Sequence, residues 1–201
     1  MASIETPRNA RSRRTAQALL KAARELIEQE GLAEVTMAAV AERAGVSRRA
    51  IYLHFASRGE LLAALYDYLN EVEDRDAAFL PMWEAADGVA ALDARAQVVA
   101  GFIPRIMPTA RALQQAARHD PDAARHWELA SRVRYEGCRQ IIERLAGEGR
   151  LAPRWTTTTA TDMLVALSSF DVVGILLNER DWTEAELADH LAAVFRQVFV
   201  V

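Results

Sequence analysis

A nine-residue stretch near the N-terminus gathers side chains that can contact a polyanion. It runs from Ser47 to Phe55 and reads SRRAIYLHF. Arginine can pair in bidentate fashion with guanine O6 and N7, and hydroxyl and imidazole groups can hydrogen-bond phosphate oxygens. The stretch therefore predicts a surface that contacts double-stranded DNA. Its candidate residues are Ser47, Arg48, Arg49, Tyr52 and His54, and Arg58 follows as a further cation.

The residues around this stretch predict the turn that would present it. Thr36 and Ser47 are suited to cap two successive helices. Gly45, between them, can take the left-handed conformation of a sharp turn. Ala41 is small where two helices must approach closely, and Ile51 supplies an apolar anchor beyond the turn. This pattern is typical of a helix-turn-helix.

A solvated helical face, with Tyr52 half-buried, is the alternative interpretation, and arginines on a surface helix would by themselves favour it. The spacing favours DNA. Ile51 and Phe55 are four positions apart and share one face, whereas Arg48 and Tyr52 share the opposite one. The polar face is then free to enter a major groove, with Arg48 in the first turn, which meets base edges.

Charge is distributed unevenly along the 201 residues. The net charge is −4, yet residues 1–60 hold ten Arg or Lys and seven Asp or Glu, which gives +3. The basic part is therefore the part that contains the candidate surface. Residues 1–11 are expected to form a flexible basic arm, which is either a solvated tail or an arm that reaches DNA.

Several sequence features point to the cytoplasm. Cys138 is the only cysteine, which excludes a disulfide framework; we expect it to be a small core residue, with a redox role as the alternative. The N-terminus lacks the apolar core of a signal peptide. The longest apolar run, Val165–Leu177, is too short to span a bilayer. We expect a cytoplasmic protein with no membrane partner.

The composition and periodicity predict an all-α fold, because Ala, Leu, Arg and Glu dominate and apolar residues recur at helical spacing. Capping boxes stand at Ser57 and Thr183, and Asp120 precedes Pro121 as a further helix start. Pro81 and Pro104 are expected to break or disturb helices. Helices are predicted over about residues 12–30, 36–44, 47–55, 57–76, 92–106, 108–118, 120–147, 156–178 and from 183 almost to the C-terminus.

The stretch EVTMAAVAERAGVSRRAIYLHFASRGELL, preceded by ALLKAARELIEQEGL, resembles the N-terminal domain of TetR-family transcriptional regulators. The resemblance covers roughly residues 12–65 and rests on A-x-x-A-G-V-S followed by Y-x-x-F-x-S. Ala38 departs from it, because some members carry a base-contacting polar residue there. The resemblance implies that Arg48 and Arg49 read bases and that phosphates are contacted by Thr36, Tyr52, His54 and Arg58.

The resemblance also implies two domains, a helix-turn-helix DNA-binding domain of three helices over 12–57 and a helical ligand-binding and dimerisation domain over 58–201. In the family the last two helices pair with their copies in a second subunit. The last helix carries a matching apolar stripe, Leu187, Leu191, Val194 and Val198. The alternative is that this stripe packs inside one subunit. A homodimer would bind a palindromic operator, as a ligand-released repressor or, alternatively, as an activator.

An effector pocket is expected among the central helices. Apolar pockets with a few polar groups are the usual small-molecule sites, so we expect an apolar or aromatic effector. Arg105 or Arg111 would suit an acidic headgroup. The candidate wall residues are Phe102, Ile106, Met107, Trp127, Tyr135 and Phe170, with ordinary core packing as the alternative for each.

No catalytic, metal or cofactor site is expected. The sequence has no nucleophile elbow, Gly-rich phosphate loop or cysteine pair. Asp122 and His126 are four apart on one predicted helix, but a third metal ligand is not evident, and an ion pair explains them better. A helical adaptor that binds only protein would leave the polar face from Arg48 to His54 unexplained.

Overall fold

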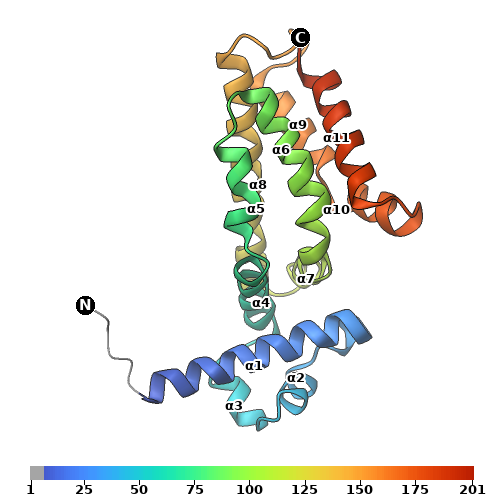
Figure 1. Cartoon of the computed structure of the whole chain (residues 1–201). Coiled ribbons are helices and arrows are strands. Elements are labelled where there is room, and N and C mark those ends of the chain that lie inside the picture. The colour runs from blue at the N-terminus through green and yellow to red at the C-terminus, as the bar shows by residue number, and fades with distance from the viewer. Residues whose placement is uncertain (1–6) are drawn as a thin grey trace. The chain divides into compact units, whose positions relative to one another are not determined.

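The structure, a computed structural model, describes residues 7–201, and its regular elements are almost all helices (Figure 1). The all-α prediction is therefore confirmed. In the described residues the only β pairing is an isolated antiparallel bridge between Leu151 and Val200. The chain divides into two compact units. The first comprises residues up to Leu69 and Pro108–Trp127, and the second comprises Asn70–Met107 and Glu128–Val201.

The first unit begins with a long helix, α1 (Pro7–Glu30), and a 3-10 turn (Leu32–Glu34). Three helices follow, α2 (Met37–Arg43), α3 (Arg48–Tyr52) and α4 (Arg58–Val72), the last of which continues past Leu69 into the second unit. α2 packs against both α1 and α3. The start of α1 corrects one expectation. Residues 7–11 are helical instead of forming a flexible arm, since Pro7 suits a first helical position, and the rest of that arm lies outside the described residues.

The corner between α7 (Ile103–Ala116) and α8 (Pro121–Gly147) completes the first unit. Asp120 caps α8 as predicted, because its Oδ1 accepts the amides of Asp122 at 2.9 Å and Ala123 at 3.0 Å. The Asp120 carboxylate lies against the first turn of α4 at Gly59, where a Cβ atom would come within 2.2 Å of it. Gly59 is therefore a packing requirement of this corner.

The second unit contains α5 (Arg75–Trp83), α6 (Gly88–Gly101), α9 (Thr157–Leu167), α10 (Phe170–Gly174), a π-helical turn (Ile175–Glu179) and α11 (Glu184–Phe199). The start of α7 and most of α8 complete it. α6 packs against both α5 and α11. The predicted capping box at the start of α11 is confirmed, since Thr183 Oγ1 accepts the Glu186 amide at 3.2 Å and the Glu186 carboxylate accepts the Thr183 amide at 2.8 Å.

The effect of prolines on the helices was predicted incorrectly from the sequence. α5 contains Pro81, and α7 contains Pro108 and has Pro104 in its first turn. At Pro104 the missing amide needs no intrahelical partner. Pro108 removes one hydrogen bond, to the carbonyl four residues back. Its neighbours Met107 and Thr109 are buried, so packing keeps the helix continuous where local preference opposes it.

The helix predicted over 156–178 is interrupted. Ser168 ends α9, and Ser169 is extended and caps α10 with its Oγ. Among the described residues, Thr157–Glu179 is one stretch whose length and mean hydropathy of 1.7 would suffice to cross a membrane, so the expectation that no run is long enough was too strict. The break at Ser168 divides this stretch, and 39% of its most apolar window is buried inside the protein. A core helix of a soluble protein can have the same length and mean hydropathy.

Candidate DNA-binding surface

The predicted turn is built by local hydrogen bonds. Thr36 Oγ1 accepts the Ala39 amide at 3.1 Å and Ser47 Oγ accepts the Ala50 amide at 3.2 Å, so both predicted caps are confirmed. Gly45 has φ of 67°, the left-handed conformation expected of it. Because both hydroxyls accept the cap hydrogen bond, each keeps its proton to donate to another acceptor, such as a phosphate oxygen.

The apolar side of the turn anchors α2 and α3 in the core. Val40, Ala41 and Ile51 are at most 1% exposed. Phe55 is buried as well, although it lies beyond the end of α3, which stops at Tyr52 and is shorter than predicted. Burial of this side fixes the rotation of α3, and the polar side is left at the surface.

Arg48 and Arg49 are exposed at the start of α3. In the part of the chain that the structure describes, neither guanidinium has an acidic partner. Tyr52 is 56% exposed and Leu53 is 77% exposed, so the alternative of a half-buried Tyr52 does not hold. Two unpaired cations and an exposed phenol on one short helix form a surface that a polyanion can neutralise.

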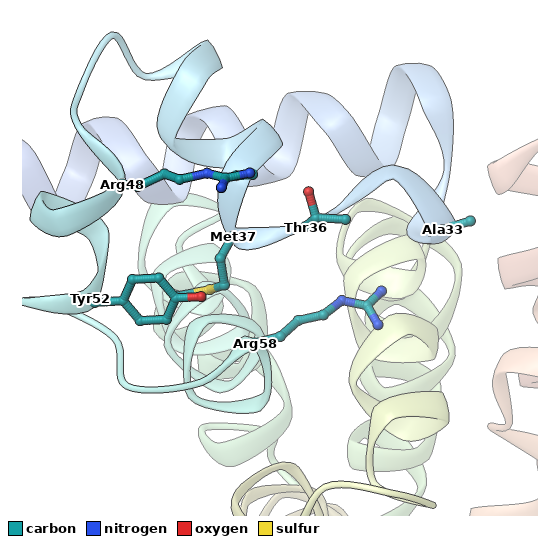
Figure 2. Close-up of a pocket in the computed structure, with 7 residues that line it drawn as sticks. Ala33, Thr36, Met37, Arg48, Tyr52 and Arg58 are labelled. Atoms are coloured by element: carbon teal, nitrogen blue, oxygen red, sulfur yellow. The ribbon is translucent and has the colours of Figure 1, made fainter.

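Arg48 and Tyr52 also line a groove of about 420 Å³ beside the start of α2. Figure 2 shows both side chains extending from α3 toward Met37, with Thr36 and Arg58 at the same groove. The groove brings together four of the seven predicted contact residues. Met37 was missed by the sequence analysis, because an apolar residue after a capping threonine carries no signal of a binding role.

The guanidinium of Arg58 already donates one hydrogen bond within the protein. One Nη atom donates to the Leu32 carbonyl at 2.7 Å, and its Nε is buried without a hydrogen-bond partner among the described residues. The side chain therefore ties the first turn of α4 to the turn after α1. A phosphate contact by Arg58 stays a prediction, and it would use the remaining nitrogen.

His54 and Arg43 complete the surroundings of the turn. His54 is half-buried after α3, with its ring centroid 6.3 Å from that of Phe55. Arg43, at the end of α2, donates to Gln29 at 3.0 Å and pairs with Glu30. Arg43 thus fastens α2 to the end of α1, whereas the role of His54 toward phosphate stays a prediction.

The residues predicted to line an effector pocket are divided between the units. Trp127 belongs to the first unit, and the other five belong to the second. Phe102, Ile106, Met107 and Phe170 are buried. The ring of Phe102 meets Phe79 of α5 edge to face, with centroids 5.5 Å apart. These contacts are compatible with a pocket wall and with core packing alike.

Tyr135 contacts a polar neighbour. The exposed Asp162 of α9 lies near its phenol, and partial burial together with the charge of Asp162 raises the pKa of Tyr135. Arg105, proposed for an acidic headgroup, pairs with Glu73 at 3.4 Å, and both Arg105 and Arg111 are exposed.

The ion pair expected between Asp122 and His126 is replaced by another. His126 Nε2 lies 3.1 Å from Asp67 Oδ1 of α4, and Asp122 pairs with Arg125 instead. The described residues contain no group of three or more side chains that could hold a metal ion. Cys138 is fully buried, in agreement with a core role.

Comparisons with known proteins agree with this geometry. Residues 19–65 match the family described as bacterial regulatory proteins, tetR family. Over 56 residues the chain is 45% identical to the HTH-type transcriptional regulator TtgR of Pseudomonas putida, a match that covers 28% of this chain and 27% of TtgR. The alignment thus spans only about a quarter of that relative's length.

Solved structures extend the likeness to the whole fold. NalD, the secondary repressor of the MexAB-OprM multidrug efflux pump in Pseudomonas aeruginosa, superposes with a TM-score of 0.73 at 23% identity, covering 94% of this chain and 98% of NalD. A transcriptional regulator from Saccharomonospora viridis in complex with choline gives 0.77 at 17% identity, covering 92% and 97%. Residues 19–65 therefore carry the sequence pattern of the tetR family of bacterial regulatory proteins, and the chain as a whole shares the fold of these regulators.

Proposed function

We propose that this protein is a DNA-binding transcriptional regulator that acts as a homodimer in the cytoplasm and leaves a palindromic operator when a small-molecule effector binds its second unit. The exposed face of α3 carries the proposal. Arg48, Arg49 and Tyr52 are exposed there, and the cations have no acidic partner in the described structure. Ordinary surface helices balance such charges with neighbouring carboxylates, as α8 does with Arg139 between Glu136 and Glu143.

A repressor that responds to a ligand is the form we favour. NalD is a repressor and the Saccharomonospora viridis regulator holds choline, and both share this fold. Ligand release requires a molecule with different affinities for the DNA-binding and non-binding conformations, and operator DNA must weaken that molecule's binding by the same factor. An activator of the same fold is the alternative. A reporter gene placed behind the regulated promoter distinguishes the two, because removal of this protein raises reporter expression if it is a repressor and lowers it if it is an activator.

A second copy of the chain is the proposed partner at α9–α11. Leu187 and Leu191 are buried within one chain, so the alternative of packing inside one subunit holds for them. Val194, Met163 and Ile175 remain exposed and apolar on the same helices. These three residues are the surface that we expect dimerisation to cover.

Selection of bound sequences from random DNA tests the proposed function. The expected result is enrichment of an inverted repeat whose half-sites lie about one helical turn or a multiple of it apart. Binding should weaken steeply with salt, since each phosphate contact releases counterions. Failure to enrich any sequence, together with no salt-dependent binding, would falsify the assignment.

The first prediction concerns base reading by Arg48 and Arg49. Replacement of either arginine by Ala should cost about 1–3 kcal/mol at each base pair that it reads. The preference for operator over random DNA should fall accordingly, because bidentate pairing to a base edge is lost. Competition binding measures this preference. Full retention of the preference in both variants would mean that other residues read the bases.

The second prediction concerns the phosphate contact of Tyr52. Its phenol is exposed at the groove, so a Tyr52→Phe variant should fold normally and bind all DNA sequences more weakly by a similar factor. Phosphate contacts carry no sequence information. Titrations of operator and random DNA measure the two factors. A loss confined to the operator would show that Tyr52 contacts a base.

A further inference from the structure

One charged side chain lies inside the second unit without a partner. Arg95, in the middle of α6, is 3% exposed and is the only charged residue in the described structure that is buried. Its Nε and Nη2 atoms are buried and have no hydrogen-bond partner. No acidic side chain among the described residues pairs with it. The unit thus keeps an uncompensated cation in its interior.

An arrangement of this kind is unfavourable for folding. Arginine stays protonated in proteins, and a charge removed from water destabilises the fold unless it is paired and hydrogen-bonded. A buried water could accept one of the hydrogen bonds but would leave the charge unbalanced. An anion that is bound during function would balance it.

The face of α6 that carries Arg95 is apolar and aromatic. Phe102 is seven residues further on, about two helical turns, so it shares the face of Arg95, and its ring packs on Phe79 of α5. Asp93, two residues before Arg95, lies on nearly the opposite side of the helix. The Asp93 carboxylate pairs with Arg196 of α11 at 3.2 Å, so the acid nearest in sequence is directed elsewhere.

Ser168 provides a second unpaired group in the same unit. Its Oγ is buried without a hydrogen-bond partner among the described residues, at the break between α9 and α10. Two residues on, the Phe170 ring lies 5.6 Å from the guanidinium carbon of Arg134 in α8. The interior of this unit therefore combines unpaired polar groups with aromatic surface, which is the usual composition of small-molecule sites.

We propose that Arg95 binds the carboxylate of an acidic small-molecule effector whose apolar part packs against the aromatic side chains of this unit. The inference rests on the proposed regulator function and names the chemical class of its effector. A carboxylate accepts two parallel hydrogen bonds from a guanidinium, and its single charge balances the single unpaired cation. A phosphate monoester carries close to two charges at neutral pH and would leave one unbalanced.

The burial of Arg95 also supplies a coupling mechanism. Its Nε and Nη2 atoms have almost no access to solvent, so a carboxylate reaches them only when α6 or the side chains around it move. The effector therefore binds a rearranged conformation better than the one described. Such a difference in affinity is what a ligand needs to shift the equilibrium between conformations.

The test compares wild type with Arg95→Met, which keeps similar volume without the charge, and with Arg132→Met, which removes an exposed cation of the same unit as a matched control. Octanoate and benzoate are the acidic probes, and octanamide and benzamide are their neutral partners. Without probe, Arg95→Met should melt roughly 2–10 °C above wild type, because an unpaired buried charge is removed. At a hundred times the Kd of an acid for wild type, that acid should raise the Tm of wild type and Arg132→Met by about 5–10 °C. The same concentration should leave the Tm of Arg95→Met unchanged.

Three results would overturn the inference: an Arg95→Met variant that melts below wild type, equal stabilisation of wild type and Arg95→Met by the acids, or no stabilisation of wild type by either acid. Binding of selected operator DNA by wild type and Arg95→Met is measured in parallel. Operator binding by both proteins with no acid response refutes the carboxylate site alone. Loss of specific DNA binding by wild type refutes the proposed function itself, whatever the probes do.

Discussion

A Val194→Glu variant should remain folded but sediment as a monomer at concentrations at which the wild-type chain is a dimer. Val194 is 39% exposed on α11, beside a stripe that is buried within the chain. If a second copy covers this position, the new carboxylate is buried without a partner. Each such charge costs about 3–5 kcal/mol, and the two-fold symmetry of a homodimer places it in the interface twice.

Ala185→Glu is the matched control for this prediction. Ala185 is exposed on the same helix, nine residues before Val194 and so on the opposite flank of the buried stripe. The Ala185→Glu substitution adds the same charge outside the proposed interface, so this variant should stay dimeric. Analytical ultracentrifugation measures the oligomeric state of both variants, and circular dichroism verifies that they are folded. A fully dimeric Val194→Glu would place the interface on another surface.

A Gly59→Ala variant should be less stable than wild type by about 1–3 kcal/mol, although alanine is the better helix former by about 1 kcal/mol. The added Cβ would lie 2.2 Å from Cγ and Oδ1 of Asp120 and 2.3 Å from Oδ2. Asp120 cannot simply turn away, because its carboxylate caps α8. Moving it gives up a cap that contributes about 1 kcal/mol.

The destabilisation by Gly59→Ala should disappear or reverse when Asp120 is replaced by Gly. Glycine at a capping position costs only a few tenths of a kcal/mol relative to the usual capping residues. In that background Gly59→Ala should be neutral or stabilising by up to about 1 kcal/mol. Denaturant unfolding of the four proteins in the cycle gives the coupling energy between the two positions, which should be about 1–4 kcal/mol. Equal effects of Gly59→Ala in both backgrounds would show that the contact with Asp120 carries no strain.

Helix starts were the part of the fold that local sequence predicted best. Thr36, Ser47, Asp120 and Thr183 all cap helices as expected. A cap requires only a side chain and an amide two or three residues away, so the sequence contains the whole interaction. The turn at Gly45 follows the same logic, because its φ is a property of one residue.

Helix ends and interruptions were predicted less well. Pro108 lies inside α7 and Ser168 interrupts an apolar helix. In the first case the burial of neighbouring side chains outweighs the lost hydrogen bond. In the second, no proline or glycine marks the break. The break coincides with Ser169, whose side chain caps α10.

The residues of the helix-turn-helix and their exposure were determined by the sequence alone, because the period of apolar side chains fixes which face of α3 is buried. Only the tertiary structure decided which partners the basic side chains have. Arg58 is held by the Leu32 carbonyl and His126 by Asp67, through partners 26 and 59 residues away in the chain. Arg95 reads in the sequence as one more helical arginine, yet packing places it inside the second unit without a counter-charge. Whether a charge is solvated, paired or uncompensated depends on what surrounds it in three dimensions, and residue order does not specify that environment.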